Sequence, residues 1–331
     1  MGDRFTIDPE TRNGIPILWL IDTTSGSRAG ILPAAGGTLW SVALCADNTN
    51  PVGDEYNDCA ELLAGDPLST IEANPWFRGR ILFPFNDRIP HGRYQWNSET
   101  YQLRVNDHDT GDAIHGLVYD QPFQTVESRC GVDFAEVVLR CGFDRRRFTG
   151  FPFAAQLDVR YTLRRERLDV ALTARNPGSR SCPVAMGIHP YVRTEPSVDT
   201  AALLCASDSW VEVDNQLLPT GNQLQSAGSP YDFEAKRSLL RRELDIALRR
   251  RRTAVAVTEV LRRGDTVVVE QETRAFAYTQ LFIPPDRESI AVEPITAATN
   301  SFNDARLGLR VLRAGDEFMA RCAFSRRMPP G

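Results

Sequence analysis

Two histidines in apolar surroundings are the first candidates for chemistry in this 331-residue sequence. His115 stands in the segment 113–117 (AIHGL), and His189 stands in the segment 187–191 (GIHPY). An imidazole gains or loses a proton near neutral pH, so either residue is suited to general acid–base catalysis. The alternative for each is a hydrogen-bonded histidine of the core. The other two histidines, which lie in turn-forming or polar stretches and are expected at the surface, are His91 and His108.

A lone carboxylate interrupts an apolar run near the C-terminus. Glu293 lies in the segment 290–295 (IAVEPI), in a strand-like pattern that stops at proline. A carboxylate in such a run is costly to bury unless it is paired or hydrogen-bonded. Burial would also raise its pKa toward the value that suits a general base near neutral pH. The alternative is a glutamate at a strand end that reaches solvent.

Two further charged residues stand among apolar neighbours. Arg88 lies in the segment 80–89 (RILFPFNDRI), and Asp245 lies in the segment 243–246 (ELDI). Asp245 is the weaker candidate for a site, because it falls on a predicted helix and a solvated position explains it equally well.

The elements that must position these residues are mostly strands. Apolar residues alternate with polar ones over 157–163 and 168–174, which is the period of a half-buried strand. Many short strands separated by turn residues predict an antiparallel β-sandwich or barrel. Further strand-like runs cover 101–105, 134–141, 253–260, 265–270, 278–283 and 317–324.

Helical patterns are few. A short helix is predicted over 58–63, and a longer one over 236–250, where Leu240, Leu244 and Leu248 recur every four residues. The chain has no strand–helix alternation and no glycine-rich nucleotide-binding motif, which argues against an α/β nucleotide-binding fold. We therefore expect an all-β protein, a large antiparallel β-sandwich with few short helices.

Composition restricts the possible partners and compartment. The net charge is −5, so the chain as a whole is not suited to nucleic-acid binding. No apolar run is long enough for a transmembrane helix, and the first residues lack the apolar core of a signal peptide. The seven cysteines are odd in number and scattered, so we expect buried free thiols, no disulfide framework and a cytoplasmic location.

Five short segments in this order resemble the aldose 1-epimerase (galactose mutarotase) family. The resemblance extends from about residue 29 to residue 324, nearly the whole chain. Each segment is weak alone, and their order on an all-β chain makes the match specific. They are 79–89 (GRILFPFNDRI), 92–94 (GRY), 113–118 (AIHGLV), 187–191 (GIHPY) and 292–294 (VEP), with Asn300 following.

The resemblance implies a fold and a site. The fold would be the galactose mutarotase-like supersandwich, as a single domain over 1–331 with a sugar cleft. By position in the matching segments, Glu293 would be the catalytic base and His189 the acid. Arg88 and His115 would hold sugar oxygens, and Asp245 would bind hydroxyls. The implied partner is a monosaccharide, with no metal, cofactor, nucleic acid or membrane, in a monomer or homodimer.

One departure from the family pattern bears on which sugar is bound. The family's N-R-I reads Asp87-Arg88-Ile89 here, so a carboxylate replaces an amide, and Asn86 is a candidate substitute for it. The alternatives left open are a hexose-phosphate mutarotase and a non-catalytic carbohydrate-binding protein on the same fold. A glycoside hydrolase using Asp245 and Glu293 is a third. A zinc site formed by His115, His189 and Glu293 has no supporting local spacing.

The implied reaction needs one base and one acid. Mutarotation opens a cyclic hemiacetal and recloses it on the other face of C1. A base removes the proton of the C1 hydroxyl while an acid protonates the ring oxygen. Reference pKa values of about 4.3 for glutamate and 6.5 for histidine allow a carboxylate and an imidazolium to coexist at neutral pH.

Overall fold

The computed structural model describes residues 3–46, 59–143, 148 and 150–329. Within these ranges the regular structure is almost entirely antiparallel strand, so the all-β prediction is confirmed. The helices among the described residues are single 3₁₀ turns, η1 (Leu68–Thr70), η2 (Pro90–Gly92), η3 (Val198–Thr200) and η4 (Ala305–Leu307).

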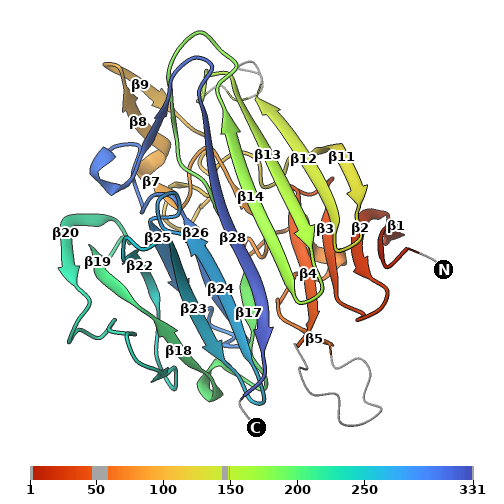
Figure 1. Cartoon of the computed structure of the whole chain (residues 1–331). Helices are drawn as coiled ribbons and strands as arrows, with labels where there is room; N and C mark the ends of the chain where they lie inside the picture. Colours follow the sequence, from red (N-terminus) through yellow and green to blue (C-terminus); the bar gives the residue numbers. More distant parts are fainter. Residues whose placement is uncertain (1–2, 47–58, 144–147, 149, 330–331) are drawn as a thin grey trace.

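A nine-stranded sheet forms the broad layer of the molecule. Its C-terminal strand β28 (Glu317–Arg327) lies between β14 (Arg167–Arg175) and β24 (Thr266–Glu272), as Figure 1 shows in dark blue, green and blue. The remaining strands on the β14 side are β11 (Gln124–Cys130), β12 (Ala135–Phe143) and β13 (Ala155–Leu163). Those on the β24 side are β23 (Val255–Leu261), β18 (Ala202–Cys205) and β21 (Arg237–Ser238).

An eight-stranded sheet carries most of the predicted site residues. Its centre is β26 (Ser289–Ile295), which pairs with β25 (Tyr278–Phe282) on one side. On the other side β26 pairs with β16 (Gly187–Ile188) and β17 (Tyr191–Arg193). The outer strands are β22 (Asp245–Arg250), β19 (Ser207–Val213), β20 (Pro219–Gln225) and β6 (Ile81–Leu82).

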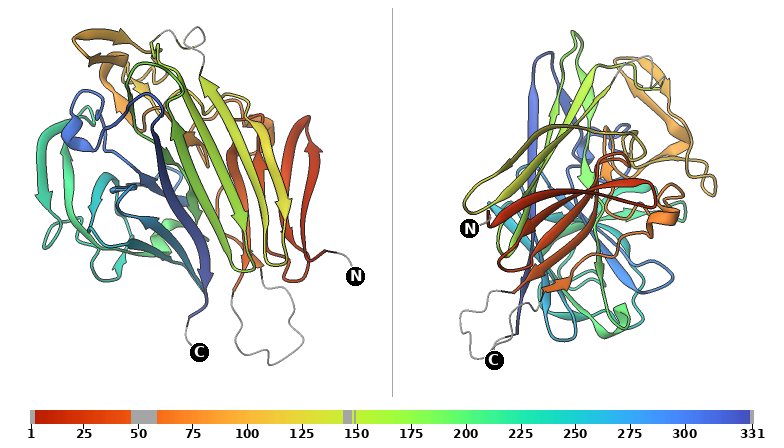
Figure 2. Two further views of the ribbon diagram at one scale, coloured as in Figure 1. Left: turned by 45° about the horizontal axis from the view of Figure 1, so that its top comes forward. Right: turned by 90° about the vertical axis from the view of Figure 1, so that its right-hand side faces the viewer.

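A five-stranded N-terminal sheet packs beside β11, β12 and β13, and both views in Figure 2 show it in red and orange. Its strands, in order, are β1 (Phe5–Arg12), β2 (Ile15–Asp22), β3 (Arg28–Leu32), β4 (Thr38–Cys45) and β5 (Cys59–Glu61). Three two-stranded pairs complete the described structure. They are β7 (Arg88–Ile89) with β10 (Ala113–Ile114), β8 (Arg93–Trp96) with β9 (Glu99–Gln102), and β15 (Cys182–Val184) with β27 (Arg310–Leu312).

The period-two pattern arises from a core between the sheets. On β13, Leu157, Val159 and Tyr161 are fully buried, whereas Arg160 between them is only half-buried. One continuous cluster of buried apolar side chains extends from Phe5 to Phe324. Burial of apolar area is the main stabilising contribution to such a core, so the alternation records which face of each strand meets it.

The predicted helix over 236–250 is wrong. Residues Arg237–Ser238 form β21 and Asp245–Arg250 form β22. The four-residue leucine spacing does not mark one buried face, because Leu240 is 59% exposed while Leu248 is fully buried. Asp245 therefore starts a strand. The predicted helix over 58–63 is also wrong where it is described: residue 58 lies outside the described ranges, and Cys59–Glu61 forms β5.

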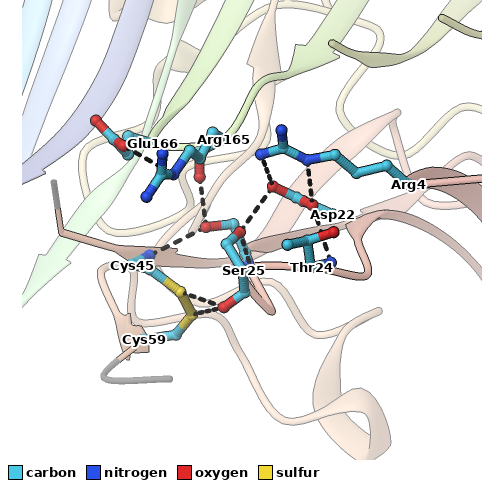
Figure 3. The surroundings of a disulfide bond; sticks show 9 residues. Arg4, Asp22, Thr24, Ser25, Cys45, Cys59, Arg165 and Glu166 are labelled. Atoms are coloured by element: carbon cyan, nitrogen blue, oxygen red, sulfur yellow. Dashed lines mark hydrogen bonds and ion pairs between the residues drawn. A yellow bond between two sulfur atoms is a disulfide. The ribbon is translucent and has the colours of Figure 1, made fainter. Parts of the chain in front are cut away.

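Two cysteines form a disulfide, against the expectation of free thiols. Cys45 and Cys59 are register partners across β4 and β5 and are bonded through sulfur, as Figure 3 shows. The Cys45 amide donates to Ser27 Oγ, whose own hydroxyl donates to the Arg165 carbonyl. Spacing along the chain did not reveal this pairing, because only strand register brings the two residues together. Of the five free cysteines, Cys130 is exposed rather than buried.

Within the described residues, no helix has the length and apolar character needed to cross a membrane. The cytoplasmic location stays a prediction.

Candidate active site

A cleft of about 1400 Å³ opens over one face of the eight-stranded sheet and gathers most of the predicted site residues. Six of the seven predicted residues line it, although they come from distant parts of the chain. They are Asp87, Arg88, His115, His189, Asp245 and Glu293.

Strand register explains why these side chains share one face. Glu293 on β26 is opposite Gln280 on β25, and Gln280 is opposite Ala247 on β22. Directly opposed residues project to the same side of an antiparallel sheet, and so do residues two apart on one strand. Asp245, two residues before Ala247, therefore projects to the same side as Glu293.

The opposite face of β26 contributes to the main core. Ile290 and Val292 belong to the large apolar cluster, whereas Ile295 belongs to a smaller cluster on the cleft side. Every residue of β26 is buried, including those that project toward the cleft. This two-sided burial is why the segment reads as a continuous apolar run with one carboxylate in it.

The central feature of the cleft is a buried histidine–glutamate pair. His189 Nε2 lies 3.4 Å from Glu293 Oε1, and both side chains are at most 5% exposed. The backbone of His189 is fixed by two hydrogen bonds, from its own amide to the Arg80 carbonyl and from the Gly79 amide to its carbonyl. The separation is slightly longer than an ordinary hydrogen bond, and such contacts often tighten when substrate binds.

Burial acts against the charge-separated pair that the reference pKa values predict. It raises the pKa of Glu293 well above its usual value, and the charges of Asp87 and Asp245 add to this effect. Burial lowers the pKa of His189 to about 3, and the charge of Arg78 acts in the same direction. Among the described residues, His189 Nδ1 has no hydrogen-bond partner that would stabilise an imidazolium. Burial thus favours a protonated Glu293 beside a neutral His189.

His115 is held as a neutral imidazole against His189. Its Nδ1 accepts the backbone N–H of Asp87 at 3.3 Å, so its Nε2 carries the proton and is a donor. Its ring meets those of His189 and Phe77 edge to face, with centroids 4.9 and 4.6 Å away. Burial, followed by the neighbouring His189 and Arg88, lowers the pKa of His115 well below its usual value.

Two residues of the predicted site, and Asn300 next to the lining residue Thr299, hold left-handed backbone conformations. Asp87, His115 and Asn300 have φ values of 58°, 61° and 60°. They are linked through the backbone, since the His115 amide donates to the Asp87 carbonyl and the Asn300 amide donates to the Arg88 carbonyl. Such conformations are uncommon for residues other than glycine and concentrate at functional sites.

Arg88 and Asp87 are both committed to partners within the protein. The Arg88 guanidinium is paired with Asp107 and also donates to Thr110 Oγ1. The Asp87 carboxylate accepts the Arg88 amide and the Thr299 hydroxyl. Burial raises the pKa of Asp87 even with the positive charge of Arg88 beside it.

Asp245 is more exposed than the other two acidic residues of the predicted site, Asp87 and Glu293. Its side chain is exposed there, and Oδ1 accepts a 2.7 Å hydrogen bond from Gln280 Nε2. The surrounding walls and the Asp87 charge raise the pKa of Asp245 to about 6. A carboxylate fixed by one donor and open on its other oxygen is suited to accept hydroxyl hydrogens.

Asn86 does not join the other predicted residues. Its side chain is 1% exposed, and Nδ2 donates to the Ala297 carbonyl at 2.6 Å, away from the cleft lining. The physical reason is that the Asn86 amide is used to hold the backbone just after β26. The Asp87 carboxylate therefore has no amide from Asn86 beside it in the cleft.

Sequence reasoning missed several residues that shape the site. Tyr191 stacks on His189 with ring planes 6° apart and centroids 5.0 Å apart. Gln280 and Thr299 orient the two aspartates. Tyr191 is the last residue of the segment 187–191 that contains His189, so the sequence offered a signal for it. Gln280 and Thr299 have no such local signal, because only long-range pairing brings them to the site. Trp76 and Phe282 were not missed, because the sequence already offers them either as rings that stack on sugar C–H faces or as core residues. They form a ring contact at 5.9 Å and line the cleft.

Acidic side chains outnumber basic ones in the lining of the cleft. In the part of the chain that the structure describes, no group of three or more His, Cys, Asp or Glu side chains is placed to hold a metal ion. Seven carboxylates line the cleft against three arginines. The arginines are Arg80, Arg88 and Arg104; the acids are Glu72, Asp87, Asp107, Asp109, Asp120, Asp245 and Glu293.

Comparisons of sequence point to one family. The family model described as Aldose 1-epimerase matches residues 52–325. The uncharacterized protein YihR of Escherichia coli K12 is 27% identical over 248 residues, which cover 72% of this chain and 75% of that protein. The human galactose mutarotase is 24% identical over 226 residues, which cover 62% of this chain and 63% of that protein.

Comparisons of structure agree on the fold. A galactose mutarotase-like protein from Clostridium acetobutylicum has a TM-score of 0.85 at 18% identity, over 98% of this chain and 99% of that one. The galactose 1-epimerase from Lactobacillus acidophilus has a TM-score of 0.79 at 16% identity, over 99% of this chain and 100% of that one. These similarities confirm the galactose mutarotase-like fold.

Proposed function

Because this chain belongs to the aldose 1-epimerase family, we propose that it interconverts the α and β anomers of an aldose. The observation that carries the proposal is the 3.4 Å approach of His189 Nε2 to Glu293 Oε1 within the acidic cleft. A base and an acid that share one proton are the groups needed to open and reclose a hemiacetal.

In the proposed reaction the shared proton moves first. Burial favours this proton on Glu293 when no sugar is bound, and its transfer to His189 gives a carboxylate and an imidazolium. The two forms have the same net charge, so no proton needs to enter from solvent. Hydroxyl groups of a bound sugar can form hydrogen bonds to the carboxylate and the imidazolium. These hydrogen bonds make the charge-separated form accessible in the buried site.

The ring then opens and closes with balanced protons. The Glu293 carboxylate takes the C1 hydroxyl proton, the His189 imidazolium protonates the ring oxygen, and the bond between C1 and that oxygen breaks. The open-chain aldehyde rotates about its C1–C2 bond. The former ring oxygen returns its proton to His189 and attacks the other face of C1, and Glu293 returns its proton to the new C1 hydroxyl. No electron or hydride carrier takes part.

The other cleft residues are proposed to bind the sugar. The His115 Nε2–H donates to a sugar oxygen, and the open oxygen of Asp245 accepts from a hydroxyl. Arg88 keeps donor groups available beyond its contacts with Asp107 and Thr110, because a guanidinium has five N–H groups.

The charge of the cleft favours an uncharged sugar over a phosphorylated one. Among the described residues lining it, each arginine already has protein partners. Arg80 donates to backbone carbonyls and Asn74, Arg88 pairs with Asp107, and Arg104 pairs with Asp120. A phosphate needs positive charge that protein partners do not already balance, whereas the hydroxyls of a neutral sugar need only a free N–H group such as those left on Arg88. We therefore propose a neutral aldose as the substrate.

Polarimetry and NMR of freshly dissolved α-anomers test this function. We expect the protein to accelerate equilibration of at least one of glucose, galactose, xylose and arabinose above the spontaneous rate, with less effect on glucose 6-phosphate. Sugar binding without acceleration would support the non-catalytic alternative instead. Release of reducing sugar from an oligosaccharide would support a glycoside hydrolase, and preference for the phosphosugar would overturn the neutral substrate.

A further inference from the structure

We propose that Arg78 is a positioning residue for the proposed acid His189 and acts on it through the ring of Tyr191. This inference rests on the proposed function for the role of His189. The geometry that carries it is an ordered stack of guanidinium, phenol and imidazole behind the catalytic pair.

The Arg78 side chain is fixed by Asp66 and by two residues at or just before the start of β26. It is 8% exposed, and Nη1 donates to Ser289 Oγ at 2.8 Å at the start of β26. Nη2 donates to Asp286 Oδ2 at 3.1 Å, and Nε lies 3.4 Å from Asp66 Oδ1. A guanidinium held on all its nitrogens is a rigid plane, which lysine cannot reproduce with a single ammonium group.

That plane lies over the Tyr191 ring. The Arg78 Cζ is 4.6 Å from the ring centroid, which is within the range of a cation–π contact. Tyr191 is 1% exposed, and its ring also meets the parallel imidazole of His189, 5.0 Å away, and Phe282 edge to face at 6.4 Å. The tyrosine therefore transmits the position of Arg78 to the plane of the imidazole.

The backbone next to Arg78 holds His189 as well. The Gly79 amide donates to the His189 carbonyl, and the His189 amide donates to the Arg80 carbonyl. Gly79 has a φ of +69°, and a Cβ there would come within 2.0 Å of the Leu39 carbonyl oxygen, so only glycine fits. Segment 78–80 thus fixes the His189 backbone directly and its ring through Tyr191.

The charge of Arg78 also acts on the proton that the pair shares. The groups that face His189 are Glu293 from β26, His115 from the loop after β10, and Tyr191 from β17 with Arg78 behind it. Arg78 supplies a positive charge on the tyrosine side, which disfavours the imidazolium and makes it a stronger acid. Its removal should raise the pKa of both His189 and Glu293.

The test compares Arg78→Met and Arg78→Lys with the control Arg306→Met. Arg306 is an exposed arginine, paired only with Asp304 among the described residues, so the control removes the same charge elsewhere. We expect Arg78→Met to lower kcat about 10- to 100-fold with KM within about twofold, as misplacement of a catalytic group does. Its pH–kcat profile should move to higher pH. Arg78→Lys should restore the profile but only part of kcat.

An NMR titration of the His189 imidazole separates this inference from the proposed function. Arg78→Met should raise the His189 pKa in the sugar-free protein, whether or not the wild type is active on any aldose. A wild-type protein that is inactive on every sugar would overturn the proposed function. The comparison of the His189 pKa between wild type and Arg78→Met would still test the positioning role. An unchanged His189 pKa, or a kcat loss that only follows the unfolded fraction, would overturn the positioning role.

A second variant covers the case in which Arg78→Met does not fold. Tyr191→Leu keeps the Arg78 contacts with Ser289, Asp286 and Asp66 but removes the ring between guanidinium and imidazole. Tyr191→Leu should lower kcat and leave KM nearly unchanged. Wild-type kcat and pH profile in this variant would show that the stack does not position His189.

Discussion

The carboxyl group of Glu293 on β26 and the imidazole of His189, which lies between β16 and β17, face each other at 3.4 Å, and neither is open to bulk solvent. Burial changes the pKa of the two groups in opposite directions, so they hold a single proton as a unit. The first predictions concern this unit.

Glu293→Gln should lower kcat about 100-fold or more while sugar binding survives, because the amide keeps the shape of the side chain but cannot accept the C1 hydroxyl proton. Anomer exchange measured by NMR gives the rate, and calorimetric titration gives the binding constant. Near-normal exchange in this variant would show that Glu293 is not the base.

His189→Asn should also lower kcat about 100-fold or more, since asparagine can donate a hydrogen bond to the ring oxygen but cannot deliver a proton. The double variant with Glu293→Gln should be little worse than either single variant, because the two residues act as a unit. Multiplicative losses in the double variant, measured by polarimetry, would contradict the shared proton.

Arg88→Ala should mainly raise KM, because the guanidinium is proposed to hold sugar oxygens rather than to move protons. Its removal also leaves the partly buried Asp107 without its ion-pair partner. Stability should therefore be checked by thermal unfolding alongside steady-state kinetics. Equal falls in kcat and kcat/KM with an unchanged KM would place Arg88 in the chemical step instead.

Asp245→Asn should raise KM and at the same time stabilise the protein at neutral pH. The folded pKa of Asp245 is about 6, above its unfolded value, so the folded state binds more protons at mildly acidic pH. Ionisation of Asp245 therefore costs stability as pH rises toward and through 6. The gain in Tm over the wild type should be present at pH 8 and should shrink as pH falls toward 4. A gain independent of pH would contradict this account.

Thiol counting in denaturant tests the disulfide. Five of the seven cysteines should react without reductant and all seven after reduction, because Cys45 and Cys59 are bonded. For a separation of 14 residues, reduction should lower the free energy of unfolding by about 3 kcal/mol. Seven reactive thiols in the untreated protein would rule out the bond.

The sequence was informative where a local pattern has one physical cause. Alternation over 157–163 predicts β13 because a sandwich core buries every second residue. The apolar neighbours of His189 and Glu293 singled out both residues, and the resemblance to the aldose 1-epimerase family predicted that they act together. The four-residue leucine spacing in 236–250 failed because the same spacing also fits a strand-turn-strand arrangement with Leu240 exposed.

Other features depend on long-range pairing that no local pattern records. The hydrogen bond from Gln280 to Asp245 follows from the β22–β25 register, and the disulfide follows from that of β4 and β5. Reference pKa values predicted an ionised pair, but burial on both faces of β26 reverses the preference. The role of Arg78 was invisible for the same reason, since its partners Asp286 and Ser289 are distant in sequence.

The position of β28 has a consequence for biosynthesis. This strand, Glu317–Arg327, lies between β14 and β24 in the middle of the nine-stranded sheet. While the ribosome is still translating the preceding residues, both neighbours expose unpaired edges, which are prone to aggregate. The nascent chain can close this sheet only after residue 327 has left the exit tunnel, so chaperones that shield strand edges should increase the yield of folded protein.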